Sequence, residues 1–228
     1  MSAGPYASLN LGRTVGDDPA SVAENQRRFA EHVGYAVETL YEVQQVHGGR
    51  VEQARAELDP QAFRALPADA LISDRCALAI KVADCVAVLL ADPQTGAVAA
   101  AHAGWRGVVA ETVPATVQAL VEAYGSRPGE LVAAVFPCIS RAAFEVQDEV
   151  AQQIAGAVGS SGVVQRGAPR PHVDLALAVS LQLAHAGLSA ARIDRVTGCT
   201  FGDPARFFSF RRDHGVTGRH LAVIMARC

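Results

Sequence analysis

The chain has 228 residues, of which 50% are hydrophobic, and its formal net charge is −3 at pH 7. This length and apolar content suffice for one large core. The near-neutral charge excludes the strong positive field of proteins that bind nucleic acid or anionic membranes. The longest apolar stretch, 77–91, contains Lys81 and Asp84 and is too short and too polar to span a membrane.

The cysteines and the N-terminus indicate a cellular compartment. Five cysteines, an odd number, lie at wide and irregular intervals and form no CxxC pair. This pattern argues against a disulfide framework and favours reduced thiols. The first residues, MSAGP, lack the basic region and apolar stretch of a signal peptide. We therefore expect a cytoplasmic protein.

Gly, Pro, Asp and Asn dominate the first residues and predict a loop. A helix is then expected over 20–33, with Asp17 or Asp18 as its cap and Pro19 in its first turn. Runs rich in Ile, Val and Leu predict strands at 40–46, 70–73, 78–83 and 86–91.

The segment DPQTG at 92–96 predicts a turn, because proline fixes φ and glycine readily adopts positive φ. The chain then returns as an expected strand over 97–102. Cys85 and His102 therefore belong to the two sides of one hairpin, and we expect them to be approximate cross-strand neighbours.

Apolar residues at helical spacing predict one helix over 106–124, which Gly125 ends. Further helices are expected at 146–158 and 173–186, and further strands at 131–136, 193–196, 207–210 and 220–225. Helices and strands mix without strict βαβ alternation, and no repeat or long linker divides the chain. The sequence thus predicts a single α+β domain.

Three side chains that suit metal binding end apolar segments. Cys85 follows VAD, His102 ends an expected strand, and His47 precedes a Gly-Gly pair. One thiolate and two imidazoles form a ligand set that Zn²⁺ accepts, with a fourth position open for chemistry. Their spacing matches no short metal motif, so a buried thiol and two packed histidines are the alternative interpretation.

Two further segments are candidate phosphate sites. Gly104 and Gly107 flank Arg106 where a helix is expected to start, and free N–H groups there attract anions, with Arg106 as an added bidentate donor. Ser209 and Arg211 follow an aromatic segment and are candidates to face a phosphate or a ribose together. Exposed salt bridges are the alternative account of Arg211.

These motifs, in this order, closely resemble the YfiH/DUF152 family, which is also labelled polyphenol oxidase, laccase-domain, purine nucleoside phosphorylase or peptidoglycan-editing factor. The segments that carry the resemblance are YASLNLG at 6–12, VGDD at 15–18, QVHG at 45–48, ADALIS at 68–73, ADC at 83–85, HAGWRG at 102–107, HVDL at 172–175, FFSFRRD at 207–213 and TGR at 217–219.

The resemblance implies an α+β fold of layered sheets and helices, similar to a cytotoxic-necrotizing-factor type of toxin domain. It also implies that His47, Cys85 and His102 are the metal-binding and catalytic residues. Compared with the family pattern, the domain at 1–228 lacks an N-terminal strand and an Arg-containing Gly-Gly-Ser loop. It also has Val86 where a proline often follows the cysteine, and Phe136 where glycine is usual.

The resemblance implies work on purine nucleosides. In phosphorolysis of adenosine or inosine, phosphate would bind near Arg106 and Arg211, whereas in adenosine deamination a zinc-bound hydroxide would attack the purine. Small-molecule substrates of this kind require no nucleic-acid or membrane partner, and we expect a monomer or small homo-oligomer.

Three other functions are alternatives. A metal-free hydrolase would use Cys85 as nucleophile and His102 or His47 as base, on an amide or a peptidoglycan precursor. A polyphenol oxidase would place Cu²⁺ on the same ligands, but reduction of O₂ takes several electrons and one site offers no store for them. A structural zinc or interaction module is the non-enzymatic alternative.

Overall fold

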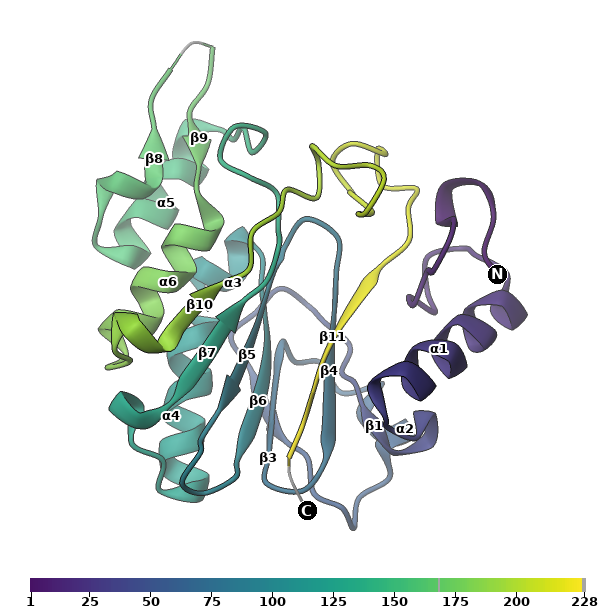
Figure 1. The fold of residues 1–228 in the computed structure, drawn as a ribbon. Coiled ribbons are helices and arrows are strands. Elements are labelled where there is room, and N and C mark those ends of the chain that lie inside the picture. Colours follow the sequence, from purple (N-terminus) through teal and green to yellow (C-terminus); the bar gives the residue numbers. More distant parts are fainter. Residues whose placement is uncertain (168, 227–228) are drawn as a thin grey trace.

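The computed structural model describes residues 1–167 and 169–226, and its strands form two main sheets and a short ribbon (Figure 1). The six-stranded sheet has the spatial order β10 (Ile193–Arg195), β7 (Val132–Val135), β5 (Val86–Ala91), β6 (Val98–Ala103), β3 (Ala70–Ser73) and β2 (Val51–Gln53). The three-stranded sheet consists of β1 (Leu40–Tyr41), β4 (Ala77–Val82) and β11 (His220–Met225), and the ribbon of β8 (Val164–Gln165) and β9 (His172–Val173).

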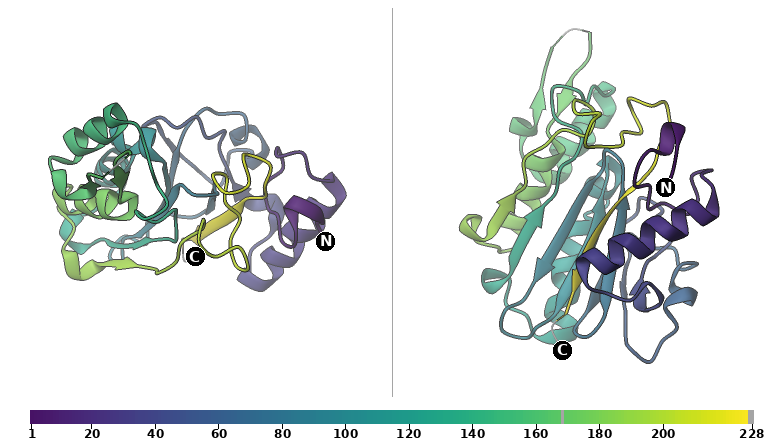
Figure 2. Two further views of the ribbon diagram at one scale, coloured as in Figure 1. Left: turned by 90° about the horizontal axis from the view of Figure 1, so that it is seen from above. Right: turned by 45° about the vertical axis from the view of Figure 1, so that its right-hand side comes forward.

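Helices lie on both flanks of the two sheets (Figures 1 and 2). On the side of the six-stranded sheet are α3 (Trp105–Val109), α4 (Thr112–Tyr124), α5 (Asp148–Val158) and α6 (Leu175–His185), and on the other flank are α1 (Pro19–Val33) and α2 (Pro60–Phe63). Short 3₁₀ turns occur at Gly4–Tyr6, Val37–Thr39, Pro128–Glu130, Ser161–Val163 and Ala190–Arg192.

The central strands β5, β6 and β3 of the six-stranded sheet are buried on both faces. Along β5, Val86 and Val88 pack into the core beneath the helices, whereas Ala87 and Leu89 pack into the core between the two sheets. β4 closes that second core with Leu78 and other side chains of its inner face. Burial on both faces explains why these strands are continuously apolar rather than alternating.

The structure confirms the predicted α+β fold and most predicted elements. The expected strands 70–73, 86–91 and 220–225 are β3, β5 and β11, and the expected helix 20–33 is α1. Asp18 caps α1, because its side chain accepts a hydrogen bond from Ser21 N at 2.8 Å. Among the described residues, no helix is both long enough and apolar enough to cross a membrane.

The prediction of one helix over 106–124 is wrong. α3 ends at Val109 and α4 begins at Thr112, with Glu111 between them at φ 54° in the left-handed region. The Thr112 hydroxyl donates to the Gly48 carbonyl at 2.6 Å. A contact with a loop far away in the sequence thus accompanies the break, and apolar periodicity carries no signal of such a contact.

The predicted strand 40–46 is also too long, since β1 ends at Tyr41. The reason lies in Gln45, whose side-chain oxygen accepts from Lys81 N and whose side-chain nitrogen donates to Lys81 O, both at 2.8 Å. One side chain therefore makes the two hydrogen bonds that a neighbouring backbone residue would make in a regular ladder.

The predicted strand 207–210 is wrong as well, because 207–209 are irregular and a turn begins at Phe210. The carbonyl of Phe207 accepts from the Arg212 guanidinium at 2.9 Å, and Asp213 N donates to Ser209 O at 3.1 Å. Phe208 N donates to the His220 ring at Nε2, 3.0 Å away, so side-chain and turn contacts take the place of a neighbouring strand.

Candidate metal centre

One edge of the six-stranded sheet gathers residues from three strands. β6 runs antiparallel to both β3 and β5, and the register pairs Ala101 with Ala70 and Ala103 with Val86. The start of β3, the start of β5 and the end of β6 therefore lie together. As a result, the residue before β3, the residue before β5 and His102 near the end of β6 are neighbours at this edge.

The structure brings the three predicted metal ligands together at this edge. The ligand atoms of His47, Cys85 and His102 all lie within 4.8 Å of one another. The two imidazole rings meet edge to face, with centroids 4.7 Å apart and an interplanar angle of 82°. His102 is buried, Cys85 is partly buried and His47 is exposed, so the cluster opens to solvent on the side of His47.

Asp69, which the sequence analysis assigned no role, organises this cluster. It is fully buried at the start of β3, and its Oδ1 lies 2.8 Å from His102 Nδ1. A carboxylate on one ring nitrogen fixes the ring and leaves Nε2 for a metal or for a proton transfer. A charged residue directly before the apolar run ALI at 70–72 was the available sequence signal, because a buried carboxylate needs a partner.

The same carboxylate holds the loop that carries His47. Its two oxygens accept hydrogen bonds from the backbone N–H groups of Val46, His47 and Gly48 at 3.2, 2.9 and 2.7 Å. His47 itself has φ 61°, a left-handed conformation that is uncommon for residues other than glycine. Asp69 therefore positions one histidine through its ring and the other through its backbone.

Gly104 leaves room for the cluster. A Cβ atom built on Gly104 would lie 2.7 Å from Cys85 Sγ and 3.4 Å from His47 Cδ2. The nearby Gly49 serves a different contact, since its Cβ would lie 2.5 Å from the Ala110 carbonyl oxygen. Only glycine at 104 lets the chain after β6 pass this close to the thiol and the ring.

The electrostatics of the cluster favour a thiolate paired with an imidazolium. Burial acts to raise the pKa of Cys85, but hydrogen bonds and charges from His102 and His47 outweigh it and lower the pKa to about 6. Burial acts to lower the pKa of His102, but Asp69 and Cys85 outweigh it and raise the pKa to about 9. A thiol with this pKa is largely ionised at neutral pH, the form in which cysteine binds metals and acts as a nucleophile.

The donor set fits a metal ion. A thiolate, an exposed imidazole and a second imidazole oriented by a carboxylate are the ligands and the outer partner expected of a catalytic Zn²⁺ site with three protein ligands. Among the described residues, this is the group of side chains with metal-ligand geometry.

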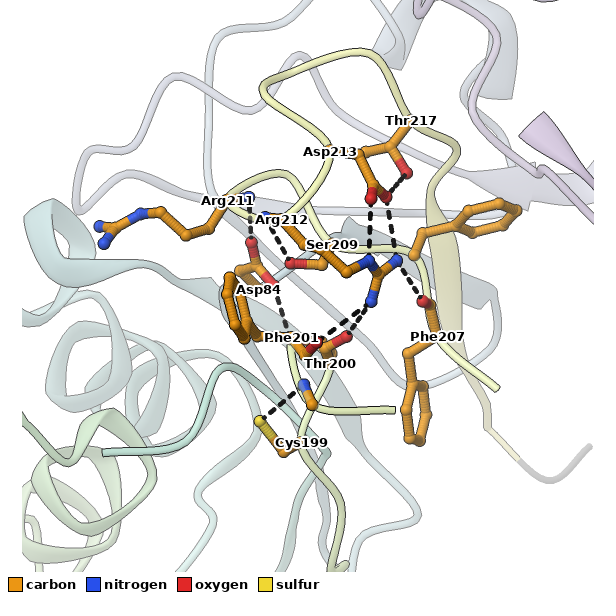
Figure 3. Close-up of polar contacts among 12 residues, drawn as sticks. Asp84, Cys199, Thr200, Phe201, Phe207, Ser209, Arg211, Arg212, Asp213 and Thr217 are labelled. Carbon is orange, nitrogen blue, oxygen red and sulfur yellow. Dashed lines mark hydrogen bonds and ion pairs between the residues drawn. The ribbon is translucent and has the colours of Figure 1, made fainter. Parts of the chain in front are cut away.

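The predicted phosphate ligands lie in different surroundings. Arg106 is exposed, with its guanidinium 4.4 Å from the Trp105 ring centroid. Arg211 is also exposed and donates to Glu145 O at 3.0 Å. Ser209 is fully buried, its hydroxyl oxygen accepts from Arg212 N at 3.1 Å, and the Arg211 guanidinium extends away from it (Figure 3).

Comparison with known proteins identifies relatives over nearly the whole chain. A family model described as multi-copper polyphenol oxidoreductase laccase matches residues 1–227. A Deinococcus radiodurans protein named purine nucleoside phosphorylase is 41% identical over 226 residues, which cover 98% of this chain and 84% of the relative. A Streptomyces griseus protein named purine nucleoside phosphorylase ORF3 is 40% identical, over 96% of this chain and 87% of the relative.

Solved structures agree with these matches. YlmD from Geobacillus stearothermophilus superposes with a TM-score of 0.93 at 34% identity, covering 100% of this chain and 88% of that one. YfiH from Bacillus licheniformis gives a TM-score of 0.93 at 29% identity, with coverage of 99% and 88%. The chain therefore belongs to the laccase-like YfiH/DUF152 family, as the sequence motifs indicated.

Proposed function

We propose that this protein is a zinc-dependent purine nucleoside phosphorylase that acts on adenosine or inosine with phosphate. The observation that carries the proposal is the cluster of His47, Cys85 and His102 around a buried Asp69. The proposed reaction and substrate are based on relatives at 34–41% identity that are named purine nucleoside phosphorylase. The cluster supports the metal, and the relatives support the substrate.

In this reaction a phosphate oxygen forms a bond to the ribose anomeric carbon. The bond from that carbon to the purine nitrogen breaks, and the base leaves with the bonding electrons and takes up a proton. A bound Zn²⁺ would supply Lewis-acid polarisation of a substrate oxygen. With His102 Nδ1 held by Asp69 and Nε2 on the metal, the proton for the leaving base would come from the hydrogen phosphate or from water rather than from His102.

The phosphate is assigned to Arg106 and Arg211, whose exposed guanidinium groups are suited to bidentate contacts with phosphate oxygens. Ser209 would contribute indirectly. Because its hydroxyl accepts from Arg212 N, it supports the turn that carries Arg211 rather than meeting the substrate.

Adenosine deamination is a second reaction for the same ligands. Water would then replace phosphate, and attack would occur on the purine ring instead of the ribose. Copper on these ligands, with polyphenol oxidation, is the alternative that the name of the family model suggests.

A metal-free hydrolase is the other candidate, and one observation favours it. Cys85, His102 and Asp69 form a thiol–imidazole–carboxylate series in which the thiol pKa is lowered to about 6. This is the arrangement of a cysteine nucleophile, its base and the group that orients the base. The substrate would be an amide or a peptidoglycan precursor.

Product analysis separates these functions. Purified protein is incubated with adenosine and phosphate, and products are resolved by chromatography with the metal content measured alongside. Adenine plus ribose 1-phosphate supports the proposal, and inosine supports deamination. No nucleoside turnover by protein that carries a metal contradicts both.

The Cys85→Ala variant tests the ligand assignment. Loss of a ligand should weaken metal binding and turnover by more than the roughly 100-fold that outer partners reach. Cys76→Ala is the matched control, because Cys76 is a buried free thiol in the core between the sheets. Phosphorolysis retained in Cys85→Ala would refute the assignment.

A further inference from the structure

Asp84, the residue before Cys85, has an unusual conformation for its position. It lies between β4 and β5 with φ 83°, in the left-handed region that residues with a Cβ rarely occupy. Its side chain is only 8% exposed. Such a conformation persists only where surrounding contacts hold it. The partners of Asp84 therefore fix the backbone conformation that leads into Cys85.

Those partners come from distant segments. The Thr200 hydroxyl donates to Asp84 Oδ1 at 2.6 Å, and Arg211 N donates to Asp84 Oδ2 at 2.7 Å (Figure 3). The backbone carbonyl of Asp84 accepts from Ile139 N at 3.0 Å. Both carboxylate oxygens and the carbonyl are thus fixed from outside the β4–β5 connection.

A second residue holds these donors in place. The Arg212 guanidinium donates to Thr200 O at 2.8 Å and to Phe207 O at 2.9 Å, and it pairs with Asp213 at 2.8 Å (Figure 3). Thr217 in turn donates to Asp213 Oδ2 at 2.9 Å. The Arg212 side chain therefore links Thr200 to Phe207 and, through Asp213, to Thr217. These contacts connect the two ends of the 199–217 segment and hold the Thr200 hydroxyl at Asp84.

The position of the thiol tolerates little change. Cys85 Sγ lies where a Cβ on Gly104 would approach to 2.7 Å, so the sulfur packs directly against the chain after β6. A rotation of the peptide between Asp84 and Cys85 would move the sulfur relative to both imidazoles. Metal ligands need placement to within a fraction of an ångström.

We propose that Asp84 is a positioning residue for Cys85, and that the 199–217 segment acts on the metal centre through Thr200 and Arg212. The carboxylate oxygens of Asp84 are taken up by Thr200 and Arg211 N, so Asp84 acts through Cys85. It sets the direction from which the Cys85 side chain enters the cluster. This inference rests on the proposed function only in taking Cys85 to be a metal ligand.

The test compares three threonine variants in zinc affinity, measured by competition with a chromogenic chelator. Thr200→Val removes the hydroxyl that Asp84 accepts from and should weaken zinc binding about tenfold or more, the range for outer partners. Thr200→Ser keeps the hydroxyl and should restore affinity. Thr116→Val is the matched control, because Thr116 is equally buried but donates only to Thr112 O within α4.

Unfolding temperatures of the variants separate positioning from stability. If Thr200→Val and Thr116→Val lose similar stability but only Thr200→Val loses zinc affinity, the inference holds. If both bind zinc as tightly as the parent chain, the inference is overturned. Should Thr200→Val not fold, Arg212→Lys replaces it, since lysine cannot span Thr200 O and Phe207 O, and unchanged zinc affinity in that variant is equally contradictory.

A metal-free readout keeps this test distinct from that of the proposed function. The rate of Cys85 alkylation after chelation should change in Thr200→Val and return in Thr200→Ser. If the parent chain shows no phosphorolysis but both readouts respond, the proposed function fails and the inference stands. If phosphorolysis is present but neither readout responds, the inference fails alone.

Discussion

The candidate metal centre combines two kinds of construction. His102 lies in β6 and Cys85 directly precedes β5, and a continuous antiparallel ladder sets the register of these two strands. His47 and the 199–217 segment come from loops, which single carboxylates hold in place. Asp69 accepts from three backbone N–H groups around His47, and Asp84 accepts from Thr200 and Arg211.

This difference determines where the site is vulnerable. In the ladder, many backbone hydrogen bonds fix the strands themselves, so the backbone of His102 and of Val86, which follows Cys85, does not depend on one side chain. In the loops, the position of a ligand depends on one buried carboxylate, whose loss leaves several donors without a partner. We therefore expect the largest effects of substitution on the loop side to come from Asp69 and Asp84.

The largest expected contrast is between two thiols of the metal-free protein. Burial raises the pKa of Cys138 to about 12, whereas the pKa of Cys85 is lowered to about 6. As pH rises through about 6, Cys85 loses its proton, so at neutral pH its thiolate fraction should exceed that of Cys138 by roughly 10⁴-fold or more. Site-resolved alkylation with iodoacetamide across pH 4–9 should show a rate that levels off above about pH 6 for Cys85 and does not level off for Cys138.

Histidine variants then assign the effect to one side of the site. His102→Ala should move the Cys85 alkylation midpoint further upward than His47→Ala, because the hydrogen bond from His102 acts more strongly on the thiol. Equal shifts would show that strand and loop contribute alike. A midpoint near 9 in the unmutated chain would contradict the ionised thiol altogether.

The next largest effect is expected for Asp69→Asn. An amide cannot accept on all the sites that His102 and the His47 loop use, so metal affinity should fall about 10- to 100-fold. Asp92→Asn is the matched control, since Asp92 is also buried but accepts from Gln94 N in the turn between β5 and β6. Equal metal affinity in both variants, measured by chelator competition, would remove Asp69 from the centre.

Gly104→Ala should have a smaller effect, on the ladder side. The added Cβ meets Cys85 Sγ at 2.7 Å and forces the thiol or the chain to shift, which should weaken metal binding by about tenfold. Gly156→Ala, at an exposed position of helix α5 where a Cβ meets nothing within 4 Å, should instead stabilise the fold by about 0.5–1 kcal/mol. Metal titration and thermal unfolding distinguish the two.

The smallest effect is expected for Gln45→Leu, which removes both hydrogen bonds to the Lys81 backbone. The free energy of unfolding should fall by about 1–2 kcal/mol, while metal affinity changes little. Gln118→Leu, on the exposed face of α4, provides the comparison and should stay within about 0.5 kcal/mol. A loss of metal binding in Gln45→Leu would show that the hydrogen bonds of Gln45 to the Lys81 backbone also hold His47 in position.

The sequence predicted the ladder side of the site better than the loop side. The apolar runs at 86–91 and 97–102 and the turn between them predict a hairpin, which places Cys85 near His102 as β5 and β6 do. The break between α3 and α4 has one local signal, Pro114 in the first turn of α4, whereas the contact between Thr112 and Gly48 at the break depends on tertiary structure. The sequence could have indicated a role for Asp69, because a buried carboxylate before an apolar strand needs hydrogen-bond partners. Its three backbone donors in the His47 loop could not be predicted, because they depend on tertiary structure.

The most direct test of the central claim is X-ray absorption at the zinc edge of the protein purified without added metal. The account predicts about one zinc per chain, with one sulfur scatterer near 2.3 Å and two nitrogen scatterers near 2.0 Å. In Cys85→Ala the sulfur contribution should vanish. A zinc shell without sulfur in the parent chain, or a sulfur shell that survives in Cys85→Ala, would contradict the assignment of His47, Cys85 and His102 as the metal ligands.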